Sequence, residues 1–147
     1  MTKRTTILIL FLALFSANVV AQNWITNIDQ AKAKASADKQ NILLIFSGSD
    51  WCAPCMKLDK FIWQSEEFKT FSKDHFVLLR ADFPKQKKNK LSDEQQAHND
   101  KLAEKYNPNG YFPLVVILDK NGEIIGNTGY KNVSPAEYIK QLQALEK

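Results

Sequence analysis

Apolar residues dominate three short segments of the chain, at 42–46, 76–82 and 114–118. Apolar runs of this length are typical of strands whose two faces are both buried, as in a parallel sheet covered by helices. Residues 119–122 have the composition of a turn, so residues 123–126 are expected to pair with the third segment as a hairpin. The pattern therefore predicts four strands in one covered sheet.

Helical patterns lie before, between and after these strands. Ser92 with Gln95, and Ser134 with Glu137, have the spacing of a capping box, in which side chains satisfy free backbone donors at a helix start. Pro135 is compatible with the first helical turn, which has no inward donor to lose. The predicted helices cover 27–39, a segment from about 53, 65–73, a segment from 92 to about 105, and the segment after 134.

The predicted order of elements is α-β-α-β-α-β-β-α. A parallel βαβ half is followed by an antiparallel ββα half, which indicates an α/β protein with a mixed central sheet and helices on both faces. No repeat, low-complexity linker or break in composition divides residues 22–147, so a single domain is expected there.

Residues 1–21 have the organisation of a secretory signal peptide. Lys3 and Arg4 provide a positive start, residues 7–15 are all apolar, and Ala21 ends a short stretch suited to cleavage. An uncleaved membrane anchor is the alternative, but a spanning helix needs roughly 20 apolar residues. We therefore predict an exported protein, periplasmic or secreted, whose domain covers 22–147.

The charge of the chain is modest. The sequence has 20 lysine and arginine residues against 16 acidic ones, a formal net charge of +4. Cleavage of the signal peptide would remove two basic residues and leave +2, which gives no indication of nucleic-acid binding. The lysine-rich residues 85–90 are interpreted either as a solvated loop or as a docking patch for an acidic partner.

Cys52 and Cys55 are the only cysteines, and they follow the first strand at the expected start of a helix. A structural disulfide is one interpretation, but closing so short a loop would contribute only about 2 kcal/mol. Metal binding with His75, at the expected start of the second strand, and His98, on a polar helix, is another. These histidines lack zinc-finger spacing. The position favours paired thiols that transfer electrons, with no metal or cofactor.

Two motifs in this order of elements resemble those of the thioredoxin superfamily. The first is Trp-Cys-Ala-Pro-Cys at 51–55, after the first strand, and the second is Phe-Pro at 112–113, before the third. The resemblance covers about residues 24–147. It is closest in character to secreted bacterial thioredoxin-like proteins, which are similar to the thiol domains of periplasmic disulfide reductases. It implies the thioredoxin fold and a thiol–disulfide oxidoreductase.

The resemblance implies separate roles for the two cysteines. Cys52 is expected to be the exposed, attacking nucleophile, since it lies before the helix begins and the helix dipole favours its thiolate. Cys55, one turn inside and facing the core, would resolve the mixed disulfide. Pro54 lies where isomerases and strong oxidants of the superfamily tend to carry histidine, which favours a reductant.

The resemblance also implies a substrate-binding surface. Pro113 would form a cis peptide bond beside the redox pair, and Phe112 would present its backbone to an extended substrate peptide. Without the resemblance, Pro113 would be interpreted as a trans proline at the start of a strand. Trp51 is expected to shield the thiols and form part of this surface, with an ordinary core aromatic as the alternative.

Two acidic residues are candidate modulators of the thiols. Asp50 either influences the redox pair and its partners or serves only as a turn residue. Thioredoxins often carry a buried acid on the first strand, and this chain has none at 44–46. Asp59 either substitutes for that acid as a proton relay or faces solvent in a pair with Lys57 or Lys60.

The predicted function is that of an exported oxidoreductase that cycles between a dithiol and a Cys52–Cys55 disulfide. Its substrates would be disulfide-containing exported proteins, a membrane electron donor would re-reduce it, and it would act as a monomer. Two alternatives stay open. One is a dedicated thiol carrier for cytochrome maturation, and the other is a thioredoxin-fold module that binds peptides beside Pro113 without turnover.

Overall fold

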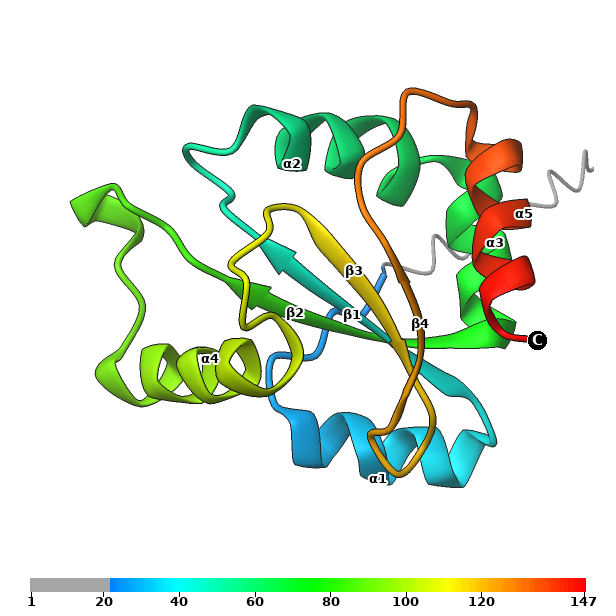
Figure 1. The fold of residues 1–147 in the computed structure, drawn as a ribbon, viewed down its shortest axis with the longest axis horizontal. Helices are drawn as coiled ribbons and strands as arrows, with labels where there is room; N and C mark the ends of the chain where they lie inside the picture. The colour runs from blue at the N-terminus through cyan, green and yellow to red at the C-terminus, as the bar shows by residue number, and fades with distance from the viewer. Residues whose placement is uncertain (1–21) are drawn as a thin grey trace, which may run out of the picture.

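The computed structural model describes residues 22–147, and the expected signal peptide lies outside these residues. The strands span Asn41–Ser47 (β1), Phe76–Asp82 (β2), Leu114–Leu118 (β3) and Ile124–Thr128 (β4). They form one sheet in the order β2-β1-β3-β4 (Figure 1). β1 is parallel to β2 and antiparallel to β3, which is antiparallel to β4. This confirms the mixed sheet made from a βαβ half and a ββα half.

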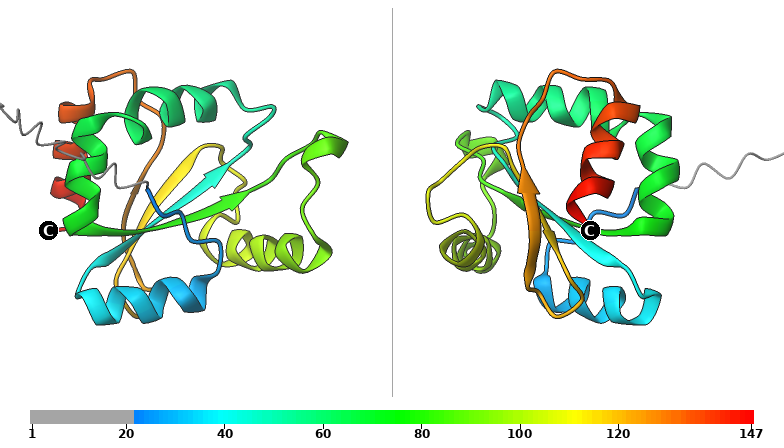
Figure 2. Two further views of the ribbon diagram at one scale, coloured as in Figure 1. Left: turned by 180° about the vertical axis from the view of Figure 1, so that it is seen from behind. Right: turned by 45° about the vertical axis from the view of Figure 1, so that its right-hand side comes forward.

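Helices cover both faces of this sheet (Figures 1 and 2). They span Ile28–Asp38 (α1), Ala53–Leu58 (α2), Glu66–His75 (α3), Asp93–Tyr106 (α4) and Pro135–Leu145 (α5). Side chains of α1 and α4 pack in one core layer, and those of α2, α3 and α5 pack in the other. None of the helices in the described residues is long and apolar enough to cross a membrane.

Burial on both faces explains the continuous apolar run of β1. Successive side chains of a strand point to opposite faces, so both faces of β1 must be apolar when both are covered. The α1 and α4 layer receives Ile42, Leu44 and Phe46, and the other layer receives Leu43 and Ile45. All five are at most 2% exposed, so both layers pack on β1.

Local capping contacts set the starts of α4 and α5. At α5 the capping box is complete, with Ser134 and Glu137 each accepting a backbone N–H of the other. At α4 only half of the predicted box forms. Ser92 accepts the Gln95 N–H, but the Gln95 side chain donates to the Thr26 carbonyl instead of returning to Ser92.

Two predictions about helices are corrected by the structure. His75 is the last residue of α3 and not the first of β2, and its Nδ1 lies 2.8 Å from the Phe71 carbonyl. The helix after the cysteines continues as a π-helical turn, η1 (Asp59–Trp63), instead of as α-helix. Apolar spacing could not reveal this turn, because Leu58 and Ile62 are both buried, the spacing expected of one face of an α-helix.

Candidate functional site

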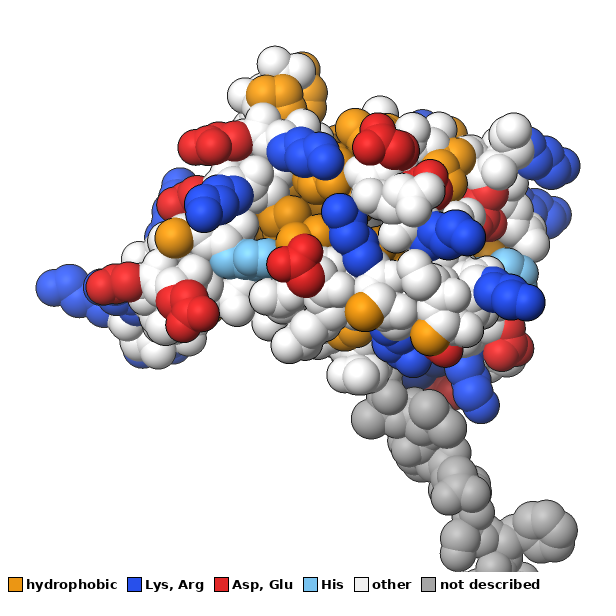
Figure 3. Space-filling view, turned by 90° about the horizontal axis from the view of Figure 1, so that it is seen from below, with side chains coloured by type: hydrophobic (Ala, Val, Ile, Leu, Met, Phe, Trp, Pro, Cys, Tyr) orange, Lys and Arg blue, Asp and Glu red, His pale blue; other side chains and the backbone are white. Residues whose placement is uncertain are grey.

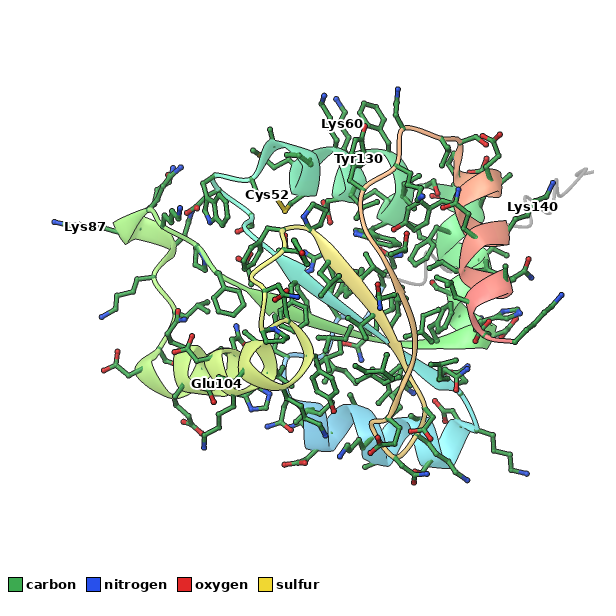
Figure 4. All side chains as sticks on the ribbon, in the orientation of Figure 1. Cys52, Lys60, Lys87, Glu104, Tyr130 and Lys140 are labelled. Carbon is green, nitrogen blue, oxygen red and sulfur yellow. A yellow bond between two sulfur atoms is a disulfide. The ribbon has the colours of Figure 1, made fainter. Side chains whose placement is uncertain are left out.

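The two cysteines form a disulfide where β1 leads into α2 (Figure 4). Cys52 is the N-cap residue of α2, and its Sγ accepts the Cys55 backbone N–H at 3.3 Å. Pro54 lies in the first helical turn, where its missing N–H breaks no helical hydrogen bond. The sulfur of Cys52 therefore lies at the positive end of the helix, where a thiolate is favoured.

Both cysteines are buried in the disulfide form, with Cys52 4% exposed and Cys55 3% exposed. The expectation that Cys52 is exposed is therefore wrong for this form, whereas the inward position of Cys55 is confirmed. The cause is local, because the Cys52 sulfur is bonded to an inward-facing residue and accepts that residue's N–H. Only a small part of the disulfide is therefore open to a partner in this form.

A surface groove lies beside the helix start. The Phe112–Pro113 peptide bond is cis, as the resemblance implied. Leu114 pairs with Phe46, so the proline comes next to the end of β1 from which the chain turns toward the cysteines. The groove is lined by Pro54, by residues 111–114 and by residues 127–131. The structure thus brings the cis proline and the redox helix to one surface.

Trp51 is a surface aromatic of this site. It is 38% exposed, its ring packs edge-on against Phe112 with centroids 5.4 Å apart, and its Nε1 donates to the Phe83 carbonyl at 2.7 Å. The indole lies against Gly48, where any Cβ would overlap it. The core-aromatic alternative is therefore wrong, and Trp51 joins the turn before Cys52 to the cis-proline segment.

Asp50 fastens the lysine-rich segment to the turn before Cys52. Its carboxylate accepts the backbone N–H groups of Lys85 and Gln86 and the side-chain amide of Asn89, all at 2.9 Å. These donors hold the pKa of Asp50 below its ordinary value, the Lys85 N–H contributing most. Asp50 is thus more than a turn residue, and its oxygens are directed at this segment.

Asp59 forms an ion pair with Arg80 of β2, with 2.8 Å between Oδ1 and Nη2. Its Oδ2 accepts a hydrogen bond from the Gln64 side chain at 2.5 Å. The predicted pairing with Lys57 or Lys60 is wrong, because Asp59 begins the π-helical turn and is directed toward β2. With its side chain 35% exposed and both oxygens engaged, Asp59 differs from a buried proton-relay acid.

The two histidines lie away from the cysteines, His75 at the end of α3 and His98 on α4. His98 Nε2 accepts the Ile28 N–H at 3.2 Å, a contact that joins α4 to the start of α1. Within residues 22–147, no three His, Cys, Asp or Glu side chains are grouped to hold a metal ion. The disulfide is the reactive group that the described part of the chain presents.

A disulfide at a helix start, next to a cis proline and at the end of a mixed four-stranded sheet, defines a thiol–disulfide oxidoreductase of the thioredoxin fold. The sequence model of the thioredoxin-like family matches residues 23–120, and the chain belongs to this family.

Individual relatives extend this assignment. Disulfide bond reductase DsbH of Chlamydia pneumoniae is 34% identical over 115 residues, which cover 78% of this chain and 68% of the relative. Thioredoxin-related protein DsbJ of the same organism is 31% identical over 108 residues, 72% of this chain but 30% of the relative. A solved DsbH oxidoreductase matches with a TM-score of 0.78 at 30% identity, covering 86% of this chain and 85% of that one.

Two contacts at the site were missed by sequence reasoning. The N–H and hydroxyl of Ser49 both donate to the Asp82 carboxylate, at 2.9 and 2.5 Å. The Lys85 ammonium lies 4.0 Å from the Trp51 ring centroid. Both contacts join the turn before the cysteines to residues more than 30 positions away, and no spacing in the sequence indicates such pairs.

Proposed function

We propose that this protein is an exported disulfide reductase that cycles between the Cys52–Cys55 disulfide and the dithiol. The observation that carries the proposal is the N-cap position of Cys52, whose sulfur accepts the Cys55 N–H. The same N–H and the helix dipole favour a thiolate at Cys52 once the disulfide is reduced, and the thiolate is the species that attacks disulfides.

The reaction proceeds in two exchanges. The Cys52 thiolate attacks one sulfur of the partner's disulfide, and the other partner sulfur leaves as a thiolate that takes a proton from solvent. Cys55 then loses its proton, attacks the Cys52 sulfur and displaces the second partner sulfur. Two electrons pass to the partner, and the Cys52–Cys55 disulfide forms. The exchange uses no cofactor, and a dithiol donor in the membrane would supply the two electrons that restore the enzyme.

Two features support reduction as the direction of transfer. Pro54 leaves the motif without the histidine that would stabilise the thiolate further and make the disulfide more oxidising. The relative DsbH is a disulfide bond reductase and shares 34% of its aligned residues with this chain. We expect a reduction potential nearer to that of thioredoxin, about −270 mV, than to that of DsbA, about −120 mV.

The proposed partners are disulfide-containing proteins in the same exported compartment, and the enzyme would meet them as a monomer. Support for export comes from the signal-like sequence of residues 1–21. The groove at the cis proline is open to an extended peptide. Trp51 would contact that peptide, and Phe112, which precedes the cis bond to Pro113, would present its backbone to the peptide next to Cys52.

Insulin reduction by dithiothreitol tests the proposal. We expect the wild type to accelerate precipitation of the insulin B chain, and Cys52→Ser to abolish this activity. Cys55→Ser should instead trap partners as mixed disulfides through Cys52, which mass spectrometry identifies. The proposal is wrong if the wild type reduces no protein disulfide with any dithiol donor, or if its potential against glutathione matches that of a strong oxidant.

A further inference from the structure

A lysine-rich segment projects from the molecule next to the redox site. Residues 85–90 contain four lysines and no acidic residue, and all six are exposed. The segment includes the short helical turn η2 (Lys87–Asn89), which lies at the left-hand end of Figure 1. Lys87 points away from the body there in Figure 4, and blue side chains project at the same end in Figure 3.

The segment is held in place by hydrogen bonds. Asp50 accepts three N–H donors from it, and the Gln86 side chain donates back to the Asp50 carbonyl at 3.2 Å. The turn is closed by the Asn89 N–H, which donates to the Gln86 carbonyl at 2.9 Å. Because Asp50 lies two residues before Cys52, these bonds position the lysines relative to the disulfide.

Lys85 connects the segment to the groove at the cis proline. The Lys85 ammonium lies over the Trp51 ring, and the Trp51 ring also packs against Phe112, with centroids 5.4 Å apart. A partner chain that reaches Cys52 past Trp51 would therefore pass beside Lys85, the first lysine of the segment.

Most of this positive charge is unpaired. Lys90 lies 3.6 Å from Asp93, but within residues 22–147 neither Lys87 nor Lys88 forms an ion pair. The carboxylate of Asp50 is engaged by N–H donors. A fixed group of ammonium ions attracts an anionic surface and repels a cationic one.

We propose that residues 85–90 are a docking surface for acidic protein partners, which selects disulfides flanked by aspartate or glutamate. This inference rests on the proposed function, and it adds that the charge of the partner determines which disulfides are reduced fastest. Charges at the edge of an interface act mainly on the association rate and on partner choice. An anionic membrane could also attract these lysines. A protein partner is favoured because hydrogen bonds tie the segment to the turn before Cys52, which a partner's disulfide must reach.

Three synthetic peptides test the proposal. They share one disulfide and differ only in four flanking residues, which are all aspartate, all serine or all lysine. Their rates of reaction with the reduced protein are measured in low salt and in 0.5 M salt. We expect the aspartate peptide to react about 10-fold faster than the lysine peptide in low salt, with a ratio near 1 in high salt.

Charge-reversed variants test whether residues 85–90 cause the preference for the aspartate peptide. Lys87→Glu/Lys88→Glu should remove or invert this preference. The matched control, Lys120→Glu/Lys140→Glu, makes the same change in net charge at exposed positions outside the site and should retain it. Lys140 lies at the opposite end of the molecule from Lys87 in Figure 4. Equal melting temperatures of the two variants establish that both remain folded.

The possible outcomes separate this proposal from the reductase function. Equal rates for the three peptides, or a preference that survives Lys87→Glu/Lys88→Glu, overturns the docking surface and leaves the reductase intact. No reaction with any peptide overturns both. Sedimentation with vesicles of equal phosphatidylglycerol and phosphatidylcholine tests the membrane alternative. Vesicle binding that Lys87→Glu/Lys88→Glu abolishes, with an unchanged peptide preference, would show that the segment contacts lipid and not protein partners.

Discussion

Replacing Tyr138 by phenylalanine tests how the chain beside the groove is held. Tyr138 of α5 is fully buried, its ring packs edge-on against Trp63, and its hydroxyl donates to the Gly129 carbonyl at 2.8 Å. Gly129 follows β4 and lies close to Pro113, since a Cβ there would be 3.4 Å from the Pro113 carbonyl oxygen. The substitution keeps the ring and removes only the hydroxyl, so it isolates one hydrogen bond between α5 and the groove.

The expected cost follows from that single bond. The Gly129 carbonyl is only partly buried, so loss of this hydrogen bond should lower the free energy of unfolding by about 1 kcal/mol. Burial also raises the pKa of Tyr138 far above its ordinary value of 10.0. The folded protein therefore retains a proton that the unfolded chain releases above pH 10. This contribution to stability is complete below pH 10 and is lost as the pH rises further, by up to about 1.4 kcal/mol per pH unit.

Urea unfolding at pH 7 and pH 11 measures both effects. At pH 7 the Tyr138→Phe variant should be less stable than the wild type, and the difference should shrink at pH 11. Tyr111→Phe is the control, because Tyr111 is 61% exposed and its change should stay within about 0.5 kcal/mol at pH 7. The reasoning is refuted if the two variants are equally stable at pH 7, or if the difference from the wild type does not depend on pH.

Three further predictions follow from contacts at the site and at a helix start. Gly48→Ala should displace Trp51, because the new Cβ would overlap the indole. Tryptophan fluorescence measures this change, and an emission spectrum identical to that of the wild type would contradict it. Arg80→Gln leaves Asp59 without its ion pair. Because both side chains are about one-third exposed, we expect the free energy of unfolding in urea to fall by about 1 kcal/mol. An unchanged free energy of unfolding would argue against a stabilising pair. The backbone N–H of Ser134, the N-cap residue of α5, holds the pKa of Glu137 below its ordinary value of 4.5. The ionised Glu137 carboxylate therefore stabilises the fold above that pH, and this stabilisation is lost as the pH falls below it. Melting temperatures of Glu137→Gln between pH 6 and 3 should fall less than those of the wild type, and parallel curves would count against the cap.

Much of the fold could be predicted from local patterns. Burial on both faces of a strand requires consecutive apolar residues, which is why β1, β2 and β3 stand out in the sequence. Helix caps act over three or four residues, so the starts of α4 and α5 were also visible. The cis bond at Pro113 came from the resemblance alone, because most such bonds are trans.

By itself, then, the sequence determined the order of the elements and the position of the redox pair at a helix start, since both depend on residues close together in the chain. Only the tertiary structure decided what surrounds the pair. Asp50 meets Asn89, 39 residues away, and Asp59 meets Arg80, 21 residues away, and in each case the two partners lie on different segments of the fold, beyond the reach of any local pattern. Such partners depend on which strands are neighbours and where each one ends, and these are properties of the assembled sheet.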